Sequence, residues 1–459
     1  MSFNKNLVRW IGVALLLAGV QAHAEPYLAA QMGLKCAQCH VNPTGGGLRS
    51  VFGNTFAQTT LAQKRLGAEE DLWTGQVMKF LSIGGNARAN FNYEDVPHQQ
   101  ASNDFAVEEA RAYFDFGVIP NRLSVYIDQR FAPGNATNME ANIRYWLKEN
   151  TFYVKAGRMY LPFGYRLEDD SAFVRQLSGI NMQAPDEGVE VGLESGSWTA
   201  QLAISNGAGG GSEVDNGKQI TTRAEFVQSR WRVGASVLYN DTDLGTRTGV
   251  GGFGGVVFGP VTLLGELDYI DDDSINNGTK LMASLAEADW LIAQGHNLKL
   301  TYEWYEPNDD VDEDEQTRTS VLYEWSPIQF MQLRAGVRFY DGIPQNDNQN
   351  RTQAFLQLHG FFSTAGRRAG PLLRRETGAL RKVRRAGTEA RVRRARHRAR
   401  RARSGPGLRR GRRHRHVRVA GGRAGPRGRH GSLAAAPAVG APRDRRQPAA
   451  GGCLAALLP

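Results

Sequence analysis

Residues 36–40, Cys-Ala-Gln-Cys-His, are the part of this sequence whose residue types and spacing could do chemistry. Two thiols three positions apart can each form a thioether with one vinyl group of a haem, and the histidine that follows can then ligate the iron. We therefore predict one covalently attached haem c, held by Cys36 and Cys39, with His40 as the proximal iron ligand.

Three other interpretations of this motif stay open. A thioredoxin-like redox pair also uses Cys-x-x-Cys, but it belongs to a βαβ context that the neighbouring sequence does not indicate. A zinc site needs a second pair of ligands nearby, and the sequence near the motif offers none. A plain disulfide between Cys36 and Cys39 would leave His40 without a role.

The motif does not fix the second axial ligand of the iron. Met78 follows closely enough in sequence to serve as a distal ligand, and methionine ligation would raise the potential of the haem. The alternatives are that Met78 is an ordinary apolar residue entering the first strand, or that no sixth protein ligand exists. The other histidines and methionines before the tail are His98, His296, His359, Met32, Met139, Met159, Met182, Met282 and Met331.

The elements that position this motif begin with an export signal. Lys5 and Arg9 precede the apolar run "WIGVALLLAGV", and small residues end the segment at Ala24. The run is too short to span a membrane, so we predict that residues 1–24 are a signal peptide removed on export. The mature chain then works outside the cytoplasm.

The charge of the chain is divided between an acidic part and a basic tail. After Phe362 the chain has 28 of its 56 Lys and Arg residues but only 3 of its 46 Asp and Glu residues. Residues 1–362 therefore hold 28 basic and 43 acidic residues, a net charge of −15. The tail, residues 363–459, is mostly Arg, Ala, Gly, Pro and Leu, and it has too little apolar area to fold. We interpret it as a disordered segment from out-of-frame translation; the alternative is a basic arm for nucleic acid or anionic lipid.

Residues 77–362 alternate apolar and polar side chains and show no lasting helical period. "WRVGASVLY" and "LKLTYEWY" are typical, and about sixteen such segments occur. Tight turns such as "IPNR" and "FGPV" alternate with long loops such as "EPNDDVDEDEQ", and the last segment, "TQAFLQLHGFF", stops on Phe362. We predict an all-β fold: a transmembrane antiparallel β-barrel of about 16 strands in a Gram-negative outer membrane, both ends periplasmic. Tryptophans expected at strand ends, as in aromatic girdles, are Trp198, Trp231, Trp304 and Trp325.

The charges on the alternating segments favour a barrel over a soluble β-sandwich. A sandwich core cannot hold many unpaired charges, whereas a barrel of this size should enclose an aqueous lumen. In "AGRMYLPFGYR" we expect a strand that ends in an inward-folding loop, with Pro162 and Gly164 at its bend; Arg158 and Arg166 are candidates for an anion constriction. The charges predicted to face inward are Arg111, Asp115, Asp128, Arg130, Arg144, Arg223, Glu225, Arg232, Lys299, Glu303, Arg334 and Arg338.

The stretch "PYLAAQMGLKCAQCHVNPTGGGLRSVFGNTF" resembles the haem segment of fused outer-membrane porin–cytochrome proteins, whose members include iron oxidisers. The resemblance is specific at Cys36, Cys39 and His40, and it departs through the insertion "NPTGGG". It implies a mono-haem cytochrome segment, residues 25–76, followed by the barrel, residues 77–362. Gly45–Gly47 would let the backbone fold closely against the haem.

These parts together predict electron transfer across the outer membrane. The partners would be periplasmic c-type cytochromes, membrane lipid and an external donor or acceptor such as ferrous iron, so the protein is either an iron oxidase or an electron carrier. The alternatives are a diffusion porin with a structural or regulatory haem, and electron flow in the outward direction. Carboxylates expected in external loops, which attract cations, are those of residues 168–170, 271–273 and 309–315.

Overall fold

A computed structural model describes residues 25–67, 72–209, 211–213, 215–275 and 278–363. Two segments predicted from the sequence, the signal peptide of residues 1–24 and the basic tail from residue 364 onward, lie outside the described residues. None of the helices in the described ranges has the length and apolar character needed to cross a bilayer.

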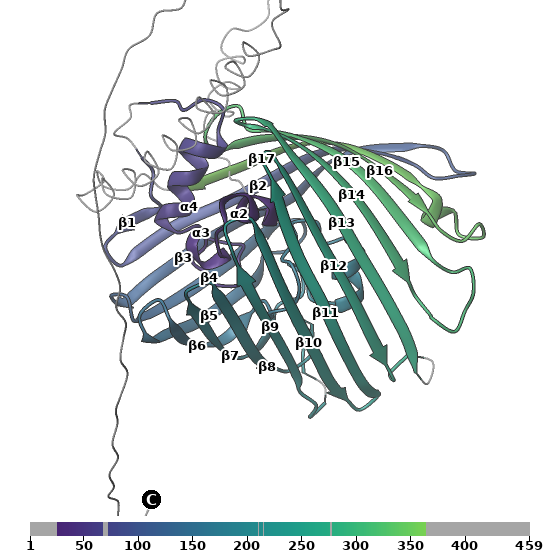
Figure 1. Cartoon of the computed structure of the whole chain (residues 1–459), viewed down its shortest axis with the longest axis horizontal. Helices are drawn as coiled ribbons and strands as arrows, with labels where there is room; N and C mark the ends of the chain where they lie inside the picture. Colours follow the sequence, from purple (N-terminus) through teal and green to yellow (C-terminus); the bar gives the residue numbers. More distant parts are fainter. Residues whose placement is uncertain (1–24, 68–71, 210, 214, 276–277, 364–459) are drawn as a thin grey trace, which may run out of the picture. The chain divides into compact units, whose positions relative to one another are not determined.

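Sixteen antiparallel strands, β2 to β17, pair in sequence order, and β17 closes the ring on β2, with Thr352 opposite Asp95 (Figure 1). The predicted barrel and its strand number are confirmed. A short strand, β1 (Gln76–Met78), pairs with the start of β2. The barrel strands are β2 (Leu81–Asp95), β3 (Ser102–Ile119), β4 (Leu123–Ala132), β5 (Thr137–Lys148), β6 (Phe152–Met159), β7 (Asp186–Ser195), β8 (Trp198–Ser205), β9 (Gln219–Val227), β10 (Trp231–Thr242), β11 (Gly245–Phe258), β12 (Val261–Asp272), β13 (Thr279–Ala293), β14 (His296–Glu306), β15 (Gln316–Trp325), β16 (Met331–Asp341) and β17 (Thr352–Ser363).

The two ends of the barrel differ in the length of their connections. At the end where β2 begins and β17 ends, the strands are joined by turns such as residues 120–122, 196–197 and 259–260. The opposite end carries loops such as 206–218 and 307–315, with short exceptions at residues 133–136 and 243–244. Short turns mark the periplasmic end of outer-membrane barrels, so both ends of the strand array lie on the periplasmic side, as predicted.

The two faces of the barrel wall follow the alternation of the sequence. Exposed apolar side chains cover the outer face, as lipid contact requires, and include Ile143, Leu147, Val189, Ile204, Val233, Val237, Leu267, Leu300, Val321 and Leu356. The charges predicted to face inward lie on the inner face. Eight of the twelve are buried and four are half-buried; the buried ones are Arg111, Asp128, Arg144, Arg223, Glu225, Arg232, Lys299 and Glu303.

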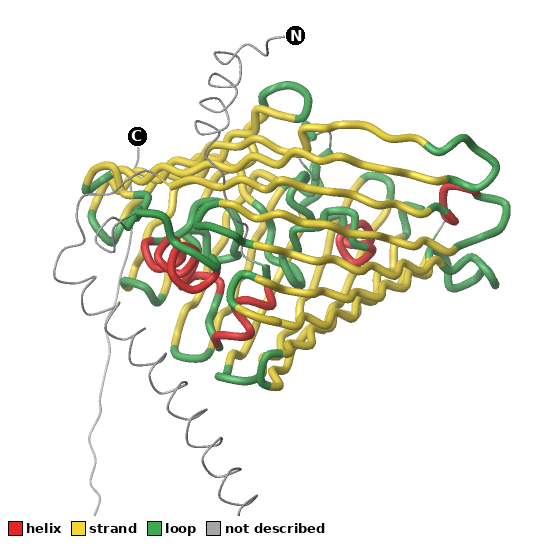
Figure 2. The backbone as a smooth tube through the Cα atoms, turned by 90° about the horizontal axis from the view of Figure 1, so that it is seen from above, coloured by secondary structure: helices red, strands yellow, loops and turns green. Residues whose placement is uncertain are grey.

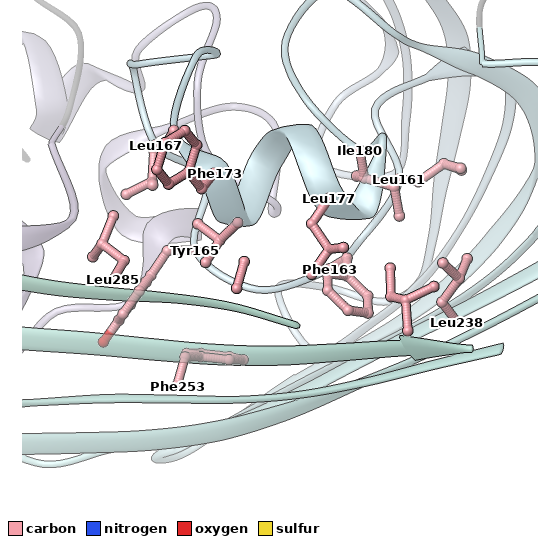
Figure 3. Packing of buried hydrophobic residues seen from close by; sticks show 14 of the residues in the cluster. Leu161, Phe163, Tyr165, Leu167, Phe173, Leu177, Ile180, Leu238, Phe253 and Leu285 are labelled. Carbon is pink, nitrogen blue, oxygen red and sulfur yellow. The ribbon is translucent and has the colours of Figure 1, made fainter. Parts of the chain in front are cut away.

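A long connection between β6 and β7, residues 160–185, folds into the barrel. It carries the helix α5 (Phe173–Ser178), and its apolar side chains pack on the inner face of strands β10 to β13 (Figure 3). Leu161, Phe163 and Leu177 of the connection belong to one buried apolar cluster. The cluster also contains the strand residues Leu238, Phe253 and Leu285. The predicted inward-folding loop is confirmed, and we call residues 160–185 the lumen loop.

The N-terminal residues 25–67 enter the barrel at its short-turn end, and we call them the plug (Figure 2). The last of them lie at the mouth, where the Gln63 and Lys64 amides donate to the Ser326 and Pro327 carbonyls. Tyr27 donates a hydrogen bond to Glu324 on the inner wall at 2.9 Å, and Lys35 pairs with Glu194 at 2.7 Å. The expected aqueous lumen is therefore wrong as stated, because folded polypeptide occupies much of it. The plug elements are α2 (Pro26–Met32), α3 (Cys36–Cys39), α4 (Val51–Phe56) and the π-helical η1 (Ala57–Leu61); a 3-10 helix, η2 (Asp347–Asn350), lies outside the plug.

Candidate functional site

The helix α3 is a single turn that presents both cysteines and leads directly into His40. The Lys35 amide donates to the Gln38 side chain at 2.9 Å, and the His40 amide donates to the Cys36 carbonyl at 3.0 Å. Positions three apart on a helical turn share one face, so Cys36 and Cys39 point to the same side. Both are free thiols in the structure.

A glycine loop fixes the orientation of the His40 ring. Gly45, Gly46 and Gly47 all have positive φ, and a Cβ at Gly45 would lie 3.5 Å from the Cys36 Cβ. The Gly46 carbonyl lies 2.8 Å from His40 Nδ1. Because a carbonyl only accepts, Nδ1 must carry the hydrogen, and in the neutral ring Nε2 then holds the lone pair. The Gly46 carbonyl therefore favours the imidazole tautomer whose Nε2 can ligate a metal.

The loop after His40 is anchored to the barrel wall. Asn42 donates to the Glu140 carboxylate on β5 at 2.9 Å, and the Leu48 amide donates to the Tyr126 hydroxyl on β4 at 3.0 Å. Both pairs are buried. The position of His40 is thus determined by the barrel as well as by the plug.

Cys36, Cys39 and His40 line one cavity between the plug, the lumen loop and the wall. The space between them measures about 770 Å³, which includes a part that is open to solvent. Eight apolar residues form the largest group in the rest of the lining. The apolar lining residues are Pro26, Leu28, Ala29, Met32, Leu34, Phe56, Ala57 and Leu61.

Four arginines line the same cavity, and two of them share one carboxylate. Arg232 Nε lies 2.6 Å from Glu225 and an Arg223 terminal nitrogen lies 3.1 Å from the other oxygen of that carboxylate. One carboxylate therefore faces two guanidinium groups, which leaves a positive surplus at this wall.

Arg49 and Arg166 line the cavity without forming an ion pair within the described residues. Arg49 lies over the Phe361 ring at 4.9 Å, and burial lowers its pKa to about 10. Arg166 lies over Tyr160 at 3.9 Å and donates to Thr44 at 2.9 Å, but its Nε and second terminal nitrogen find no acceptor among the described residues. Buried donors of this kind indicate an anionic group as a binding partner.

The thiols do not suit redox chemistry of their own. Burial raises the pKa of Cys36, and burial with the neighbouring Cys36 raises the pKa of Cys39 to about 12. A thioredoxin-like pair needs a lowered thiol pKa, so this alternative loses support. Among the residues described, no cluster of three or more His, Cys, Asp and Glu side chains is placed to hold a metal ion.

The lining residues fit a haem. Two thiols could form thioethers, the His40 imidazole could ligate the iron, and apolar side chains could border the ring. The two propionates of a haem would supply the carboxylates that the guanidinium groups of Arg49 and Arg166 lack. The donor set, the apolar lining and the charge surplus all agree with this group.

Of the other residues predicted to be functional, Met78 and Arg158 lie outside this cavity, and Arg166 lines it. Met78, predicted as a distal ligand, lies in β1 with 51% of its surface exposed and is not part of the lining. Arg158 pairs with Glu187, whereas Arg166 joins the cavity. Sequence reasoning missed Arg49, although its short spacing from the Cys-x-x-Cys-His motif is a usable signal.

Arg334 on β16 joins the plug to the lumen loop. Its guanidinium lies 3.5 Å from one Glu25 oxygen and 2.6 Å from Glu168. Lys299 on β14 also holds Glu25, at 2.9 Å. The first described residue of the plug is therefore tied to the wall and, through Arg334, to the loop.

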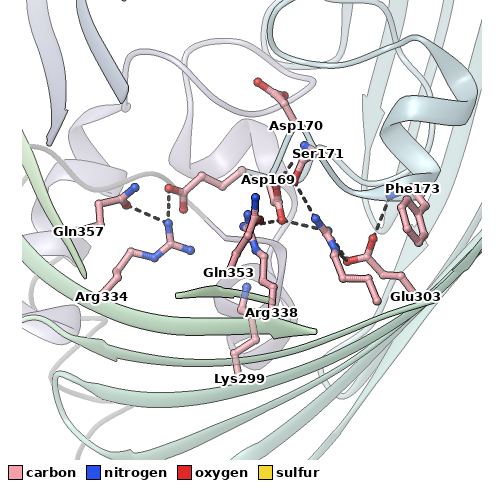
Figure 4. A network of polar contacts seen from close by, with 12 residues as sticks. Asp169, Asp170, Ser171, Phe173, Lys299, Glu303, Arg334, Arg338, Gln353 and Gln357 are labelled. Atoms are coloured by element: carbon pink, nitrogen blue, oxygen red, sulfur yellow. Dashed lines mark hydrogen bonds and ion pairs between the residues drawn. The ribbon is translucent and has the colours of Figure 1, made fainter. Parts of the chain in front are cut away.

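The carboxylates of residues 168–170, expected in an external loop, lie inside the barrel instead. Asp169 lies 3.0 Å from Arg318 and 2.7 Å from Arg338, and Figure 4 shows Asp169 beside Arg338. Glu168 lies 3.1 Å from Arg88. The expectation that this cluster attracts external cations is wrong, because inner-wall arginines already neutralise it. Sequence reasoning failed here because the inward fold of the loop reverses its exposure.

The contact between Glu25 and Glu168 predicts a pH dependence of plug docking. Burial raises the pKa of Glu168 to about 8, and the Glu25 charge adds to this rise. Arg334 and Arg88 lower the pKa, but their effect is smaller. Burial opposes ionisation of Glu25, but Lys299 and Arg334 lower its pKa to about 2. A raised carboxyl pKa stabilises the docked state most at low pH, and this contribution is lost as the pH rises from about 4.5 through about 8. The Glu25 contribution is present above about 4.5 and is lost only as the pH falls towards about 2.

We therefore expect protease cleavage of the plug to increase between about pH 5 and pH 8, by at most about tenfold per pH unit. Cleavage of the detergent-solubilised full chain, followed by gel and mass spectrometry, measures this. The control is Glu168→Gln, which removes the titrating group and should flatten the rise. An equal rise in both proteins would contradict the assignment to Glu168.

Solved structures support the fold. The chain is similar to OmpT with loop L8 deleted, an outer membrane protein of Vibrio cholerae, with a TM-score of 0.50 and 12% identity over 61% of this chain and 99% of that one. This chain is a porin-like outer-membrane β-barrel. The porin-like barrel is also similar to the anion-selective porin from Comamonas acidovorans, with a TM-score of 0.49 and 11% identity over 61% and 99% of the two chains. No protein-family model and no curated sequence matches it. At these identities the likeness bears on the fold alone, so the role of the plug must come from its own chemistry.

Proposed function

We propose that this porin-like barrel is a porin–cytochrome that transfers electrons across the outer membrane through one haem c bound inside its lumen. One observation carries the proposal: two thiols and an oriented imidazole line an apolar, arginine-edged cavity within the barrel. A motif that matched Cys-x-x-Cys-His by chance would not be expected to lie in such a cavity.

Each lining residue has a defined task in this proposal. Cys36 and Cys39 hold the haem by thioethers, so that an exported protein cannot lose it, and His40 ligates the iron through Nε2. Arg49 and Arg166 neutralise the propionates. The bound haem supplies a carrier for one electron at a time. The apolar side chains of α2, α4 and η1 exclude water from the ring.

The position of the cavity explains why a barrel is useful. The hydrocarbon core of a bilayer is about 30 Å thick, and lipid offers no redox group within it. The cavity lies in the space that the barrel encloses, between the plug, the lumen loop and the inner wall. Periplasmic c-type cytochromes are the proposed partners at the mouth.

The external donor proposed here is ferrous iron. The loop 307–315 contains the acidic run of residues 309–315 at the long-loop end, and residues 271–273 lie at the same end. Carboxylates raise the local concentration of hard cations, which supports a metal donor and hence a metal-oxidising activity. The loops act by attraction, and the proposal assigns them no fixed iron site.

The direct test is the visible spectrum of the membrane-extracted protein before and after addition of ferrous iron. We expect a reduced c-type spectrum within the mixing time. In His40→Ala the reduction rate should fall by at least about 100-fold, because even outer-shell changes at metal sites cost about 10- to 100-fold. His98→Ala, in an exposed external loop, is the control and should behave as wild type.

Two results would contradict the proposal at different levels. A colourless wild-type protein would remove the haem and with it the electron-transfer function. A coloured protein that dithionite reduces and ferrous iron does not would remove iron as the donor only.

A further inference from the structure

We infer that Met32 is the second axial ligand of the haem held by Cys36, Cys39 and His40. This inference rests on the proposed function and deepens it. The sequence alone predicted Met78 as this ligand, but Met78 is exposed in β1 and lies outside the cavity.

The helix α2 turns Met32 towards the cavity. Leu28 and Met32, four positions apart, share one helix face, and both belong to the cavity lining. The other side of the helix is held by the wall: Tyr27 is buried against Glu324, and Gln31 donates to the Gly259 carbonyl at 2.8 Å. The wall contacts therefore fix which face of α2, and so which thioether, borders the cavity.

The turn after Met32 brings α2 and α3 to the same cavity. Gly33 has φ of 63°, and its left-handed conformation ends α2 and reverses the chain within a few residues. A Cβ at Gly33 would lie 2.7 Å from the Ser229 Cα, so the turn packs directly on the β9–β10 connection. Met32 and Cys36 are thus held on either side of a tightly packed turn.

No other histidine or methionine in the described part of the chain lines this cavity. His98 is exposed beside Asp347, and His296 stacks near Trp325 at the short-turn end. His359 is buried beside Gln332 on the wall, and Met182 belongs to a neighbouring cavity of about 370 Å³. With His40 as the proximal ligand, Met32 is the remaining side chain with a neutral nitrogen or sulfur donor of the kind that ligates haem iron.

The oxygen donors of the lining are poor competitors. Glu25 is engaged by Lys299 and Arg334, and the Tyr165 ring packs edge-on against Phe253 at 5.0 Å. Burial raises the pKa of Tyr165, which disfavours the phenolate that would bind iron. A His/Met pair also raises the haem potential, which suits a high-potential donor such as ferrous iron.

The test compares Met32→Ala, Met32→His and the matched control Met78→Ala in the full-length protein. Covalent haem is first measured as the pyridine haemochrome, so that each spectrum refers to a loaded protein. For Met32→Ala we expect loss of the low-spin ferric signature by electron paramagnetic resonance, together with cyanide binding at least about tenfold tighter. Met32→His should stay low-spin at a lower midpoint potential, and Met78→Ala should match wild type.

Haem-loaded Met32→Ala with an unchanged spin state and potential would overturn this inference while leaving the proposed function intact. A shift in Met78→Ala alone would overturn it in favour of the sequence candidate. If Met32→Ala loads poorly, Met32→Leu, which preserves the apolar volume, gives the same comparison. A wild-type protein without haem would overturn the proposed function and this inference together.

Discussion

A Cys36→Ala, Cys39→Ala double variant is expected to reach the outer membrane as a folded barrel and to lack covalent haem completely. The barrel should survive because its sixteen strands pair with one another and close on themselves through β17 and β2. The haem should be lost because, in the proposed attachment, two thioethers would be its only covalent links to the chain. Haem staining of denaturing gels measures the attachment, and heat-modifiable gel mobility reports the folded barrel.

The single variants provide a graded control. Cys36→Ala and Cys39→Ala each leave one thiol, so a fraction of the chains should keep haem through one thioether. Covalent haem in the double variant would show that the attachment site lies elsewhere. A folded, coloured wild type beside an unfolded double variant would instead assign the thiols to the folding of the plug.

Deleting residues 26–66 should convert the blocked barrel into a conducting pore. The plug and the lumen loop share the lumen in the intact chain, whereas a sixteen-stranded barrel without a plug encloses a water-filled channel. We expect the single-channel conductance in planar bilayers to rise by about tenfold or more. The lumen loop stays, so the pore should remain narrower than the full barrel.

The matched control shortens the external loop of residues 309–315, which lies outside the lumen, and should leave the conductance unchanged. Equal conductance in the deletion and in wild type would mean that the plug does not block the intact barrel. That result would also favour the diffusion-porin alternative, in which the haem has a structural or regulatory role.

The barrel was predictable because lipid and lumen impose opposite demands on alternate residues. In "WRVGASVLY" the exposed Val233 and Val237 face lipid, and the buried Arg232 and Ser236 face inward. The bend at Pro162 and Gly164 could also be predicted from the sequence, because proline and glycine favour turns.

The composition of the cavity was not predictable, because its members come from segments far apart in sequence. Arg49, Arg166 and Arg232 meet only after the plug, the lumen loop and β10 are assembled. Met78 illustrates the opposite error: closeness in sequence to the motif suggested a ligand, but β1 holds this residue at the exposed rim. Distance along the chain is a poor guide when the ligands of one site lie on separate elements.

The pairing of the last strand with the first has a consequence for biogenesis. The cavity lies inside the ring that β17 and β2 complete, so covalent attachment of haem after closure would require the N-terminal helices to be withdrawn from the barrel. On the proposed function, haem would therefore be attached to the exported chain before β17 pairs with β2. The same proposal implies that a chain whose ring closes before haem attachment stays an empty barrel.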